Sequence, residues 1–129
     1  MKYSDEVLKR VREPQRVGAL PGDDVDVGTG ETGTLDEGTV TRIQVRVTDQ
    51  TVTEARFKVF GCSAAIASAS LVAELLEGAS LDEARGLTAQ RVVRVLQLAP
   101  EREQVAGMAV EAAHQALAKV EGKRQKAER

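Results

Sequence analysis

The sequence of 129 residues predicts an α+β fold, in which a small antiparallel sheet is covered on one face by helices. Two segments, residues 42–47 and 54–59, alternate between apolar and charged or polar side chains, as half-buried strands do. From residue 64 onwards the apolar residues follow helical spacing instead. Strands that are grouped ahead of a run of helices favour a sheet with its helices on one side.

The chain begins with a predicted N-terminal helix. Ser4 is a suitable N-cap, and Val7 and Val11 fall on one helical face. Pro14 ends this helix, because the residue before a proline avoids the helical region. Residues 18–38 then mix glycine with Asp, Thr and Glu without clear periodicity, which predicts an irregular region with an edge strand.

The two alternating segments predict a hairpin. Their apolar residues are Ile43, Val45 and Val47 in the first strand and Ala55, Phe57 and Val59 in the second. A short turn at Asp49 and Gln50 joins the strands. Val40 falls out of register with the first strand, so we expect a β-bulge at the beginning of that strand.

Several helices follow the hairpin. Residues 64–76 are almost all apolar or small, which predicts a helix in the middle of the fold, and Gly78 stands where its C-terminal cap would end. Ser80 begins a capping-box spacing, and another helix begins near Thr88. Pro100 precedes a last helix that carries a long apolar stripe.

Bulk composition excludes several classes of function. The net charge of −2 gives no broad basic field for nucleic acid, and an aromatic content of 2% leaves few stacking platforms for bases. No apolar run approaches the ~20 residues that span a bilayer. The N-terminus lacks the apolar stretch of a secretory signal, so we expect a cytoplasmic protein. We expect one domain over residues 1–129, with a frayed basic tail at 120–129.

Cys62 is the only cysteine, so the chain has no internal disulfide, and one copy cannot surround a metal cluster with thiolates. It lies between a predicted strand and the central helix, for which Ser63 is the expected N-cap. Unpaired N–H groups at a helix start favour a thiolate, which allows a reactive role. The other interpretation is a small buried apolar residue, and position alone does not decide between the two.

Other candidates for chemistry are weaker. His114 is the only histidine, and no second histidine or cysteine stands at ligand spacing from it, so we expect a surface residue. The carboxylates between residues 23 and 37 lack the spacing of an EF-hand and are typical of solvated loops. No nucleophile, base and orienting group can be combined from the motif spacings, so we do not predict an enzyme.

Four segments carry a resemblance to a known family. They are residues 14–18 (PQRVG), 27–30 (VGTG), 55–70 (ARFKVFGCSAAIASAS) and 78–84 (GASLDEA). With these segments the chain resembles the iron–sulfur cluster assembly scaffold family, the IscU type that also forms the N-terminal domain of NifU. The resemblance extends from Tyr3 to about Gly122.

The resemblance also implies a ligand set, which this chain keeps only in part. Where the family has Cys-Gly-Asp, the matching residues are Glu37, Gly38 and Thr39, and the His-Cys positions are Gln104 and Val105. The family's remaining cysteine is Cys62. The resemblance therefore implies Cys62 as the cofactor-binding residue and metal ligand, with Glu37 as a weak second metal ligand. Since a [2Fe–2S] cluster takes four ligands, this pair implies a cluster or iron that is weakly held, or none.

The resemblance further implies partners. A cysteine desulfurase is the expected partner, and a homodimer would bring two Cys62 thiols together. The segment Leu98–Arg102 keeps two residues of the family's five-residue chaperone motif, which argues against recruitment of the specialised heat-shock chaperone.

Three hypotheses follow. The first is an iron–sulfur cluster assembly scaffold-like protein, reduced in cluster holding, with Cys62 as sulfur acceptor or iron ligand. The second is a non-metal binding module or adaptor that keeps the fold to dock a desulfurase or another partner. The third, a thiol enzyme, needs a base near Cys62.

Overall fold

A computed structural model describes residues 3–127 of the chain. The three strands of this part are β1 (Val27–Thr34), β2 (Thr39–Thr48) and β3 (Thr51–Phe60). Its helices are α1 (Asp5–Arg12), α2 (Ser63–Leu76), α3 (Leu81–Arg85), α4 (Ala89–Leu96), the 3₁₀ turn η1 (Pro100–Arg102) and α5 (Glu103–Ala127).

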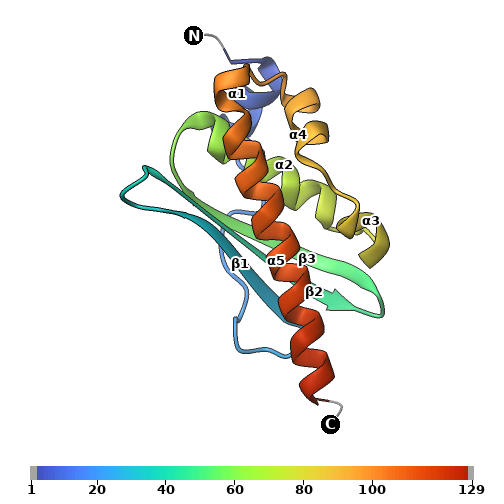
Figure 1. Cartoon of the computed structure of the whole chain (residues 1–129). Helices are drawn as coiled ribbons and strands as arrows, with labels where there is room; N and C mark the ends of the chain where they lie inside the picture. The colour runs from blue at the N-terminus through green and yellow to red at the C-terminus, as the bar shows by residue number, and fades with distance from the viewer. Residues whose placement is uncertain (1–2, 128–129) are drawn as a thin grey trace.

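The sheet has the order β1-β2-β3 and is antiparallel throughout. The helices lie over one face of it, which we call the inner face, with α5 running diagonally across β1 and β2 (Figure 1). The loop of residues 35–38 between β1 and β2, which we call the tip, projects away from the body of the molecule at the left of that view. The predicted α+β fold with an edge strand, a hairpin and terminal helices is confirmed.

The hairpin turn follows from its backbone angles. Asp49 and Gln50 both have positive φ, 51° and 65°, which two-residue turns need in order to match the twist of their strands. The predicted bulge at Val40 is wrong, because Val40 pairs in register with Phe60 and the irregularity lies between Arg46 and Val47. Val40 breaks the apolar pattern because its side chain lies on the opposite, outer face of the sheet.

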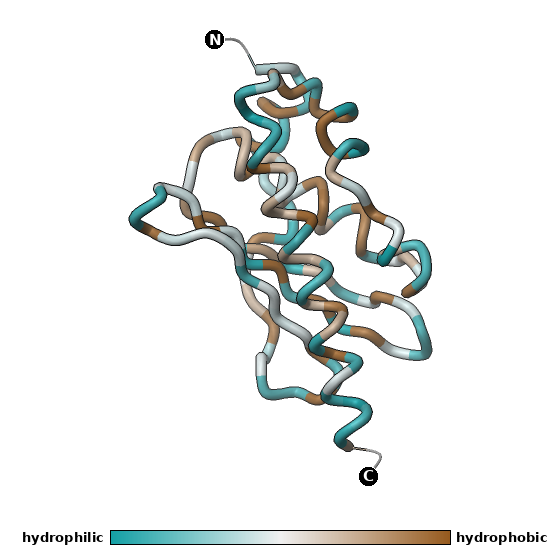
Figure 2. Tube along the Cα trace, in the orientation of Figure 1, coloured by the Kyte–Doolittle hydropathy of each residue, from teal (hydrophilic) through white to brown (hydrophobic). Residues whose placement is uncertain are grey.

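The core fills the space between the inner face and the helices, and α2 is hydrophobic along much of its length (Figure 2). Close approach of α5 to β1 depends on two glycines. A Cβ atom at Gly28 would lie 1.9 Å from the Ala116 carbonyl oxygen, and one at Gly30 would lie 1.9 Å from that of Ala112. Only glycine therefore allows this helix to lie so near the strand.

The helix ends confirm most of the predicted caps. Ser4, Ser80 and Thr88 each accept a hydrogen bond from a backbone N–H of the first turn, and Ser80 forms a complete capping box with Glu83. Gly78 has a φ of +91° directly after the C-cap of α2, as its position predicts.

The C-terminal helix is longer than expected. α5 continues to Ala127, so the prediction of a frayed tail is wrong for residues 120–127, while residues 128–129 lie outside the described part. Lys123 Nζ donates hydrogen bonds to the carbonyl oxygens of Gly22 (2.6 Å), Asp24 (3.0 Å) and Val27 (2.7 Å). Arg124 donates to the Val47 carbonyl. These basic residues hold the helix end against the sheet, whereas their charge alone suggested a solvated end.

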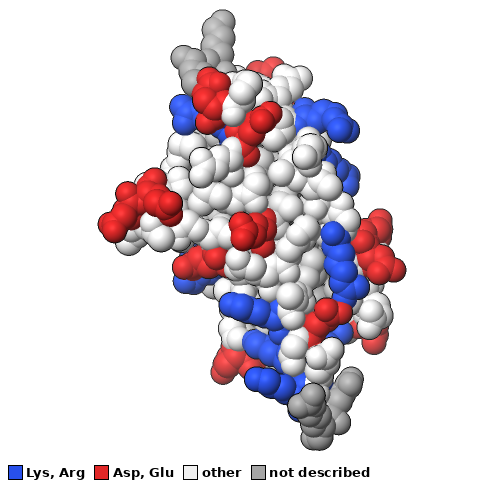
Figure 3. Space-filling view, in the orientation of Figure 1, with Lys and Arg blue, Asp and Glu red and all other residues white. Residues whose placement is uncertain are grey.

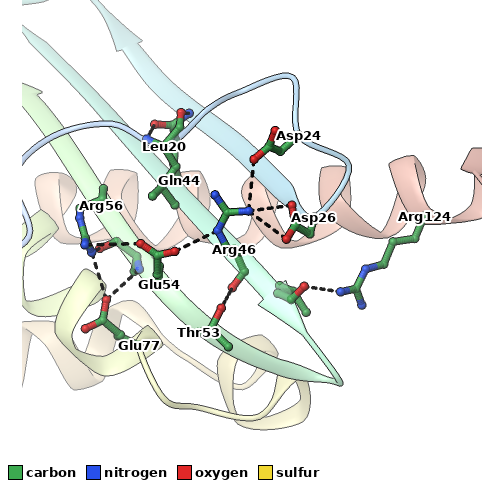
Figure 4. Close-up of polar contacts among 12 residues, drawn as sticks. Leu20, Asp24, Asp26, Gln44, Arg46, Thr53, Glu54, Arg56, Glu77 and Arg124 are labelled. Carbon is green, nitrogen blue, oxygen red and sulfur yellow. Dashed lines mark hydrogen bonds and ion pairs between the residues drawn. The ribbon is translucent and has the colours of Figure 1, made fainter.

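The outer face of the sheet is covered over one half only. Residues 18–26 leave the edge of β3 after the bridge between Val17 and Phe57 and cross towards β1. Buried Gln44 holds this segment: its Oε1 accepts from the Leu20 N–H (2.8 Å), and its Nε2 donates to the Leu20 carbonyl (3.1 Å) and to Thr29 Oγ1 (2.9 Å). We call this region the covered half (Figure 4).

Ion pairs complete the covered half. Arg46 reaches Asp24, Asp26 and Glu54 at 2.9–3.2 Å, and its hydrogen bonds lower the pKa of Asp26. Arg56 binds Glu77 at 3.2 Å near the edge of β3 (Figure 4). The charges of this half are therefore neutralised within the chain.

Across the described residues no helix is both long enough and apolar enough to cross a membrane. Charges of both signs are distributed over the face that carries α5, with an acidic group on the tip and basic groups around the C-terminal half of α5 (Figure 3).

Candidate functional site

Cys62 itself caps α2. It has extended backbone angles (φ −77°, ψ 172°) and its carbonyl accepts the Ile66 N–H at 3.1 Å, so the predicted N-cap, Ser63, is instead the first helical residue. The Cys62 side chain forms no capping hydrogen bond, is a free thiol and is partly buried against the core. The Cys62 side chain is thus not engaged in a capping hydrogen bond and is not fully buried.

The end of β3 brings a second candidate position close to this cysteine. A Cβ atom at Gly61 would lie 3.2 Å from Thr39 Cγ2 and 3.3 Å from Thr39 Oγ1. Thr39, at the start of β2, therefore lies directly against the residue before Cys62. The absence of a side chain at Gly61 makes this contact between the two strand ends possible.

A small pocket joins the tip to the start of α5. It has a volume of about 100 Å³ and is lined by Glu37, Thr39, Gln104, Val105 and Met108. The pocket thus brings together, from two distant parts of the chain, four of the positions that the family resemblance singled out: Glu37, Thr39, Gln104 and Val105. Cys62 lies beside this group, next to the Thr39–Gly61 contact, and is not among the residues that line the pocket.

The side chains in this arrangement are poor ligands for iron. Val105 is apolar and packs against the core, and Gln104 offers a neutral amide. Glu37 is exposed and its carboxylate accepts a hydrogen bond from Thr34 Oγ1 (3.0 Å) within the turn of the tip. In residues 3–127 no group of three or more His, Cys, Asp or Glu side chains could hold a metal ion. Among the positions that the resemblance singled out, only Cys62 and Glu37 carry a side chain of a type that commonly binds iron.

His114 lies far from this site. It is exposed on α5, about 14 Å further along the helix than Val105 at the helical rise of ~1.5 Å per residue. Its neighbours, in a groove between α3 and α5, are Arg85, Leu117 and Glu121. The hypothesis of a thiol enzyme that uses His114 as its base thus loses its main support.

Two features of the site were not predicted. Met108 lines the pocket one helical turn after Val105, and this spacing could have identified it. Thr41 follows Thr39 on the inner face of β2, is fully buried, and its hydroxyl has no hydrogen-bond partner in the described part of the chain. No sequence pattern marks such an orphaned hydroxyl, since it depends on what packs above the strand.

Known proteins resemble the chain over nearly its full length. Residues 2–127 match the family described as the NifU-like N terminal domain. The iron-sulfur cluster assembly scaffold protein IscU of Escherichia coli strain K12 is 37% identical over 126 residues, which are 97% of this chain and 98% of that protein. The iron-sulfur cluster assembly enzyme IscU of Drosophila melanogaster is 38% identical over 125 residues, 96% of this chain and 81% of that protein.

A solved structure supports the fold. The N-terminal part of a nitrogen-fixing NifU-like protein from Brucella abortus has a TM-score of 0.72 with this chain, at 19% identity, over 93% of this chain and 94% of that one. The sequence match and the structural match thus indicate the same family. The positions that the resemblance singled out lie where the tip, the start of α2 and the start of α5 meet. The chain belongs to the NifU-like N-terminal domain family, as a member with a single cysteine.

Proposed function

We propose that this protein works in iron–sulfur cluster assembly as a reduced scaffold whose Cys62 accepts sulfur. The observation that carries the proposal is the convergence of the family's ligand positions beside Cys62, of which only Cys62 keeps a thiol. A free, partly exposed cysteine at a helix start suits sulfur transfer, because that reaction needs one accessible nucleophile and no complete ligand set.

The transfer balances without an added oxidant or reductant. The Cys62 thiolate attacks the outer sulfur of a persulfide on a cysteine desulfurase. One sulfur–sulfur bond forms and one breaks, so that Cys62 carries the persulfide and the desulfurase cysteine leaves as a thiolate. The desulfurase is the catalyst in this scheme, and the present protein is a non-enzymatic acceptor in the cytoplasm.

Cluster holding by a single copy is correspondingly weak. Cys62 and Glu37 provide two donors where a [2Fe–2S] cluster takes four. Any iron or cluster is then cargo that is held briefly and completed by outside ligands. The segment Leu98–Arg102, which forms the connection from α4 through η1, keeps too little of the family's motif to engage the specialised chaperone.

Persulfide formation tests this proposal directly. The full chain is incubated with a cysteine desulfurase and free cysteine, and intact-mass spectrometry measures the addition of one sulfur atom. We expect the addition on wild type and its absence in Cys62→Ser. The proposal is wrong if the desulfurase turns over while Cys62 gains no sulfur.

Restoring the ligand set tests the account of weak cluster holding. The variant Glu37→Cys/Thr39→Asp/Gln104→His/Val105→Cys has the family's ligands at the positions that converge in the structure. After anaerobic reconstitution with iron and sulfide, we expect it to keep a cluster chromophore through desalting, while wild type loses it. Equal retention by both proteins would show that the missing ligands do not limit the site.

A second candidate function is an adaptor without metal or sulfur chemistry. The loss of the family's ligands at positions 37, 39, 104 and 105, with retention of the fold, favours it. Cys62→Ser separates the two functions in cells that lack the protein. Full complementation by this variant, with continued binding to the desulfurase, supports the adaptor and rejects sulfur acceptance.

A further inference from the structure

Cys62 has no second thiol in its own chain that could take sulfur from it. A protein persulfide is discharged when another thiolate attacks one of its two sulfur atoms. Under the proposed function, on which the present inference rests, the thiolate that discharges Cys62 must therefore belong to another molecule. The surroundings of Cys62 then decide which outside thiols reach the bound sulfur.

The small pocket between the tip and the start of α5 lies beside Cys62, because Thr39 lines it and also contacts Gly61. Its volume of about 100 Å³ corresponds to roughly three water molecules at ~30 Å³ each. A molecule of a few non-hydrogen atoms fits this space, whereas drug-sized ligands occupy pockets of ~300 Å³ or more. The size of the pocket therefore favours a small thiol over a peptide thiol.

One charged side chain lines this pocket. Glu37 accepts a hydrogen bond from Thr34 Oγ1 through Oε1 (3.0 Å), and it forms no ion pair with any residue of the described part. A carboxylate without a cation, in a pocket that is otherwise neutral, attracts a cationic group and repels an anionic one. The other lining residues are all uncharged: Thr39, Gln104, Val105 and Met108.

The uncharged part of the lining suits the remainder of a small thiol. Val105 and Met108 are half-buried and present an apolar wall to methylene groups, and the Met108 thioether is polarisable. Thr39 lies on the Cys62 side of the pocket, and its hydroxyl makes no hydrogen bond within residues 3–127. This hydroxyl is therefore available to donate to a sulfur atom that lies between the pocket and Cys62.

We propose that this pocket binds a small aminothiol, and that the bound thiol removes the sulfur from Cys62. The ammonium group of the aminothiol pairs with Glu37, and its methylene groups lie against Val105 and Met108. Its thiolate then reaches the outer sulfur on Cys62 from the side of Thr39. The pocket thus selects the thiol that consumes the product of the desulfurase reaction.

The discharge balances with the aminothiol as the only added reactant. Its thiolate attacks the outer sulfur of the persulfide, so that one sulfur–sulfur bond forms and one breaks. The aminothiol leaves as a persulfide that keeps the hydrogen of the outer sulfur, and Cys62 leaves as a thiolate, which the start of α2 favours. Attack on the inner sulfur would instead release sulfide and leave Cys62 in a mixed disulfide. A chain with one cysteine would need a second outside thiol to remove that disulfide.

Exchange with small disulfides tests the pocket without any persulfide. Cystamine (cationic), bis(2-hydroxyethyl) disulfide (neutral) and dithiodiglycolate (anionic) each form a mixed disulfide with Cys62, and intact-mass spectrometry follows its formation. Each rate on the folded chain is divided by the rate on the chain unfolded in urea, which removes the intrinsic reactivity of the reagent. We expect this ratio to be ~5-fold higher for cystamine than for dithiodiglycolate, the size of effect that an exposed ion pair gives.

Two pairs of variants locate this preference for a cation. Glu37→Gln should abolish it, whereas Asp36→Asn should leave it unchanged, because Asp36 is an adjacent exposed carboxylate that does not line the pocket. Gln104→Trp, which fills the pocket from an exposed position, should also abolish the preference. Gln90→Trp is its control, since Gln90 is an exposed glutamine of α4 outside this pocket.

Discharge of the persulfide should follow the same order. Wild type is loaded by a cysteine desulfurase, freed of excess cysteine and treated with cysteamine, 2-mercaptoethanol or thioglycolate. Each rate is divided by the rate of the same thiol with a small-molecule persulfide. We expect the ratio for cysteamine to exceed that for thioglycolate ~5-fold, and the mass of Cys62 to return to that of the free thiol.

Several outcomes would overturn the inference. Equal rate ratios for cystamine and dithiodiglycolate would do so, as would a preference that survives Glu37→Gln or that Asp36→Asn also removes. A mixed disulfide as the product of discharge would reject attack on the outer sulfur. A chain that gains no sulfur contradicts the proposed function, while disulfide exchange still decides whether the pocket selects a cationic thiol. Circular dichroism of each variant checks that it is folded.

Discussion

The two halves of the outer sheet face have the same strands beneath them and differ in what lies above. Over the covered half, Gln44 and Arg46 are matched by the crossing segment of residues 18–26, which supplies backbone groups and carboxylates. The rest of the outer face, around Val40, Arg42, Lys58 and Phe60, is not covered by residues 18–26, and we call it the bare half. There Phe60 is exposed, and Lys58 lacks an ion pair among the described residues.

The comparison shows that outward-facing residues of one sheet can have different roles, depending on whether their partners lie in the same chain. Outward side chains of the covered half stabilise the monomer, because their partners are in the same chain. Outward side chains of the bare half have fewer partners in the same chain: Lys58 forms no ion pair with the described residues, and Phe60 is 58% exposed. Substitutions in the two halves should therefore affect different measurements.

The largest expected effect on stability comes from the contact between α5 and β1, on the inner face beneath the covered half. Gly28→Ala would place a Cβ atom 1.9 Å from the Ala116 carbonyl oxygen and force β1 away from α5. We expect the free energy of unfolding to fall by about 3 kcal/mol, measured by urea denaturation. Gly22→Ala is the control, because its Cβ would meet only atoms at 3.8 Å or beyond, and its effect should stay within about 0.5 kcal/mol.

A smaller effect should come from the covered half itself. Gln44→Leu would leave the buried N–H and carbonyl of Leu20 without partners, at a cost of about 2 kcal/mol in unfolding free energy. Lys58→Met, on the same face in the bare half, should change stability by less than about 0.5 kcal/mol. If the two variants destabilise the monomer equally, the division between the halves is wrong.

The smallest expected effect is on the free energy of unfolding at acidic pH. Burial raises the pKa of Glu77, but the Ala55 N–H and the Arg16 and Arg56 guanidinium groups outweigh burial, so the pKa lies below its ordinary value of 4.5. A lowered pKa in the folded state means that Glu77 stabilises the protein above pH 4.5 and that this stabilisation is lost as the pH falls through the folded-state pKa.

Glu77→Gln should therefore flatten the decline of stability below pH 4.5, by about 1 kcal/mol or less. Unfolding midpoints at neutral and acidic pH measure this. Glu111→Gln is a suitable control, since Glu111 forms no ion pair with the described residues. If Glu111→Gln flattens the decline of stability to the same extent, the acid sensitivity does not come from the contacts of Glu77.

Much of the fold could be predicted because local rules decide it. Alternation predicted β2 and β3, and serine and threonine predicted the starts of α1, α3 and α4. The failures concern tertiary contacts. The predicted bulge at Val40 is wrong because an apolar residue on the outer face of a sheet breaks the alternation just as a shift of register would.

The candidate site was predictable only in its parts. Cys62 was identified as the only cysteine, at a predicted helix start, whereas Glu37 was identified from the resemblance to a family, since positions 37, 39, 62 and 104 share no local motif. That Thr39 lies against Gly61, and that Glu37 and Val105 line one pocket, depends on how three ends of different elements meet.

The sequence by itself determined the number of thiols. It also determined the hairpin with its turn and the N-caps of α1, α3 and α4, because each of these depends on neighbouring residues. Only the tertiary structure decided that Lys123 would hold the end of α5, that Cys62 and not Ser63 would cap α2, and that half of the outer face would stay bare. The physical reason is that these outcomes depend on backbone carbonyls, strand ends and loops that are far apart in sequence, whose partners exist only once the chain has folded.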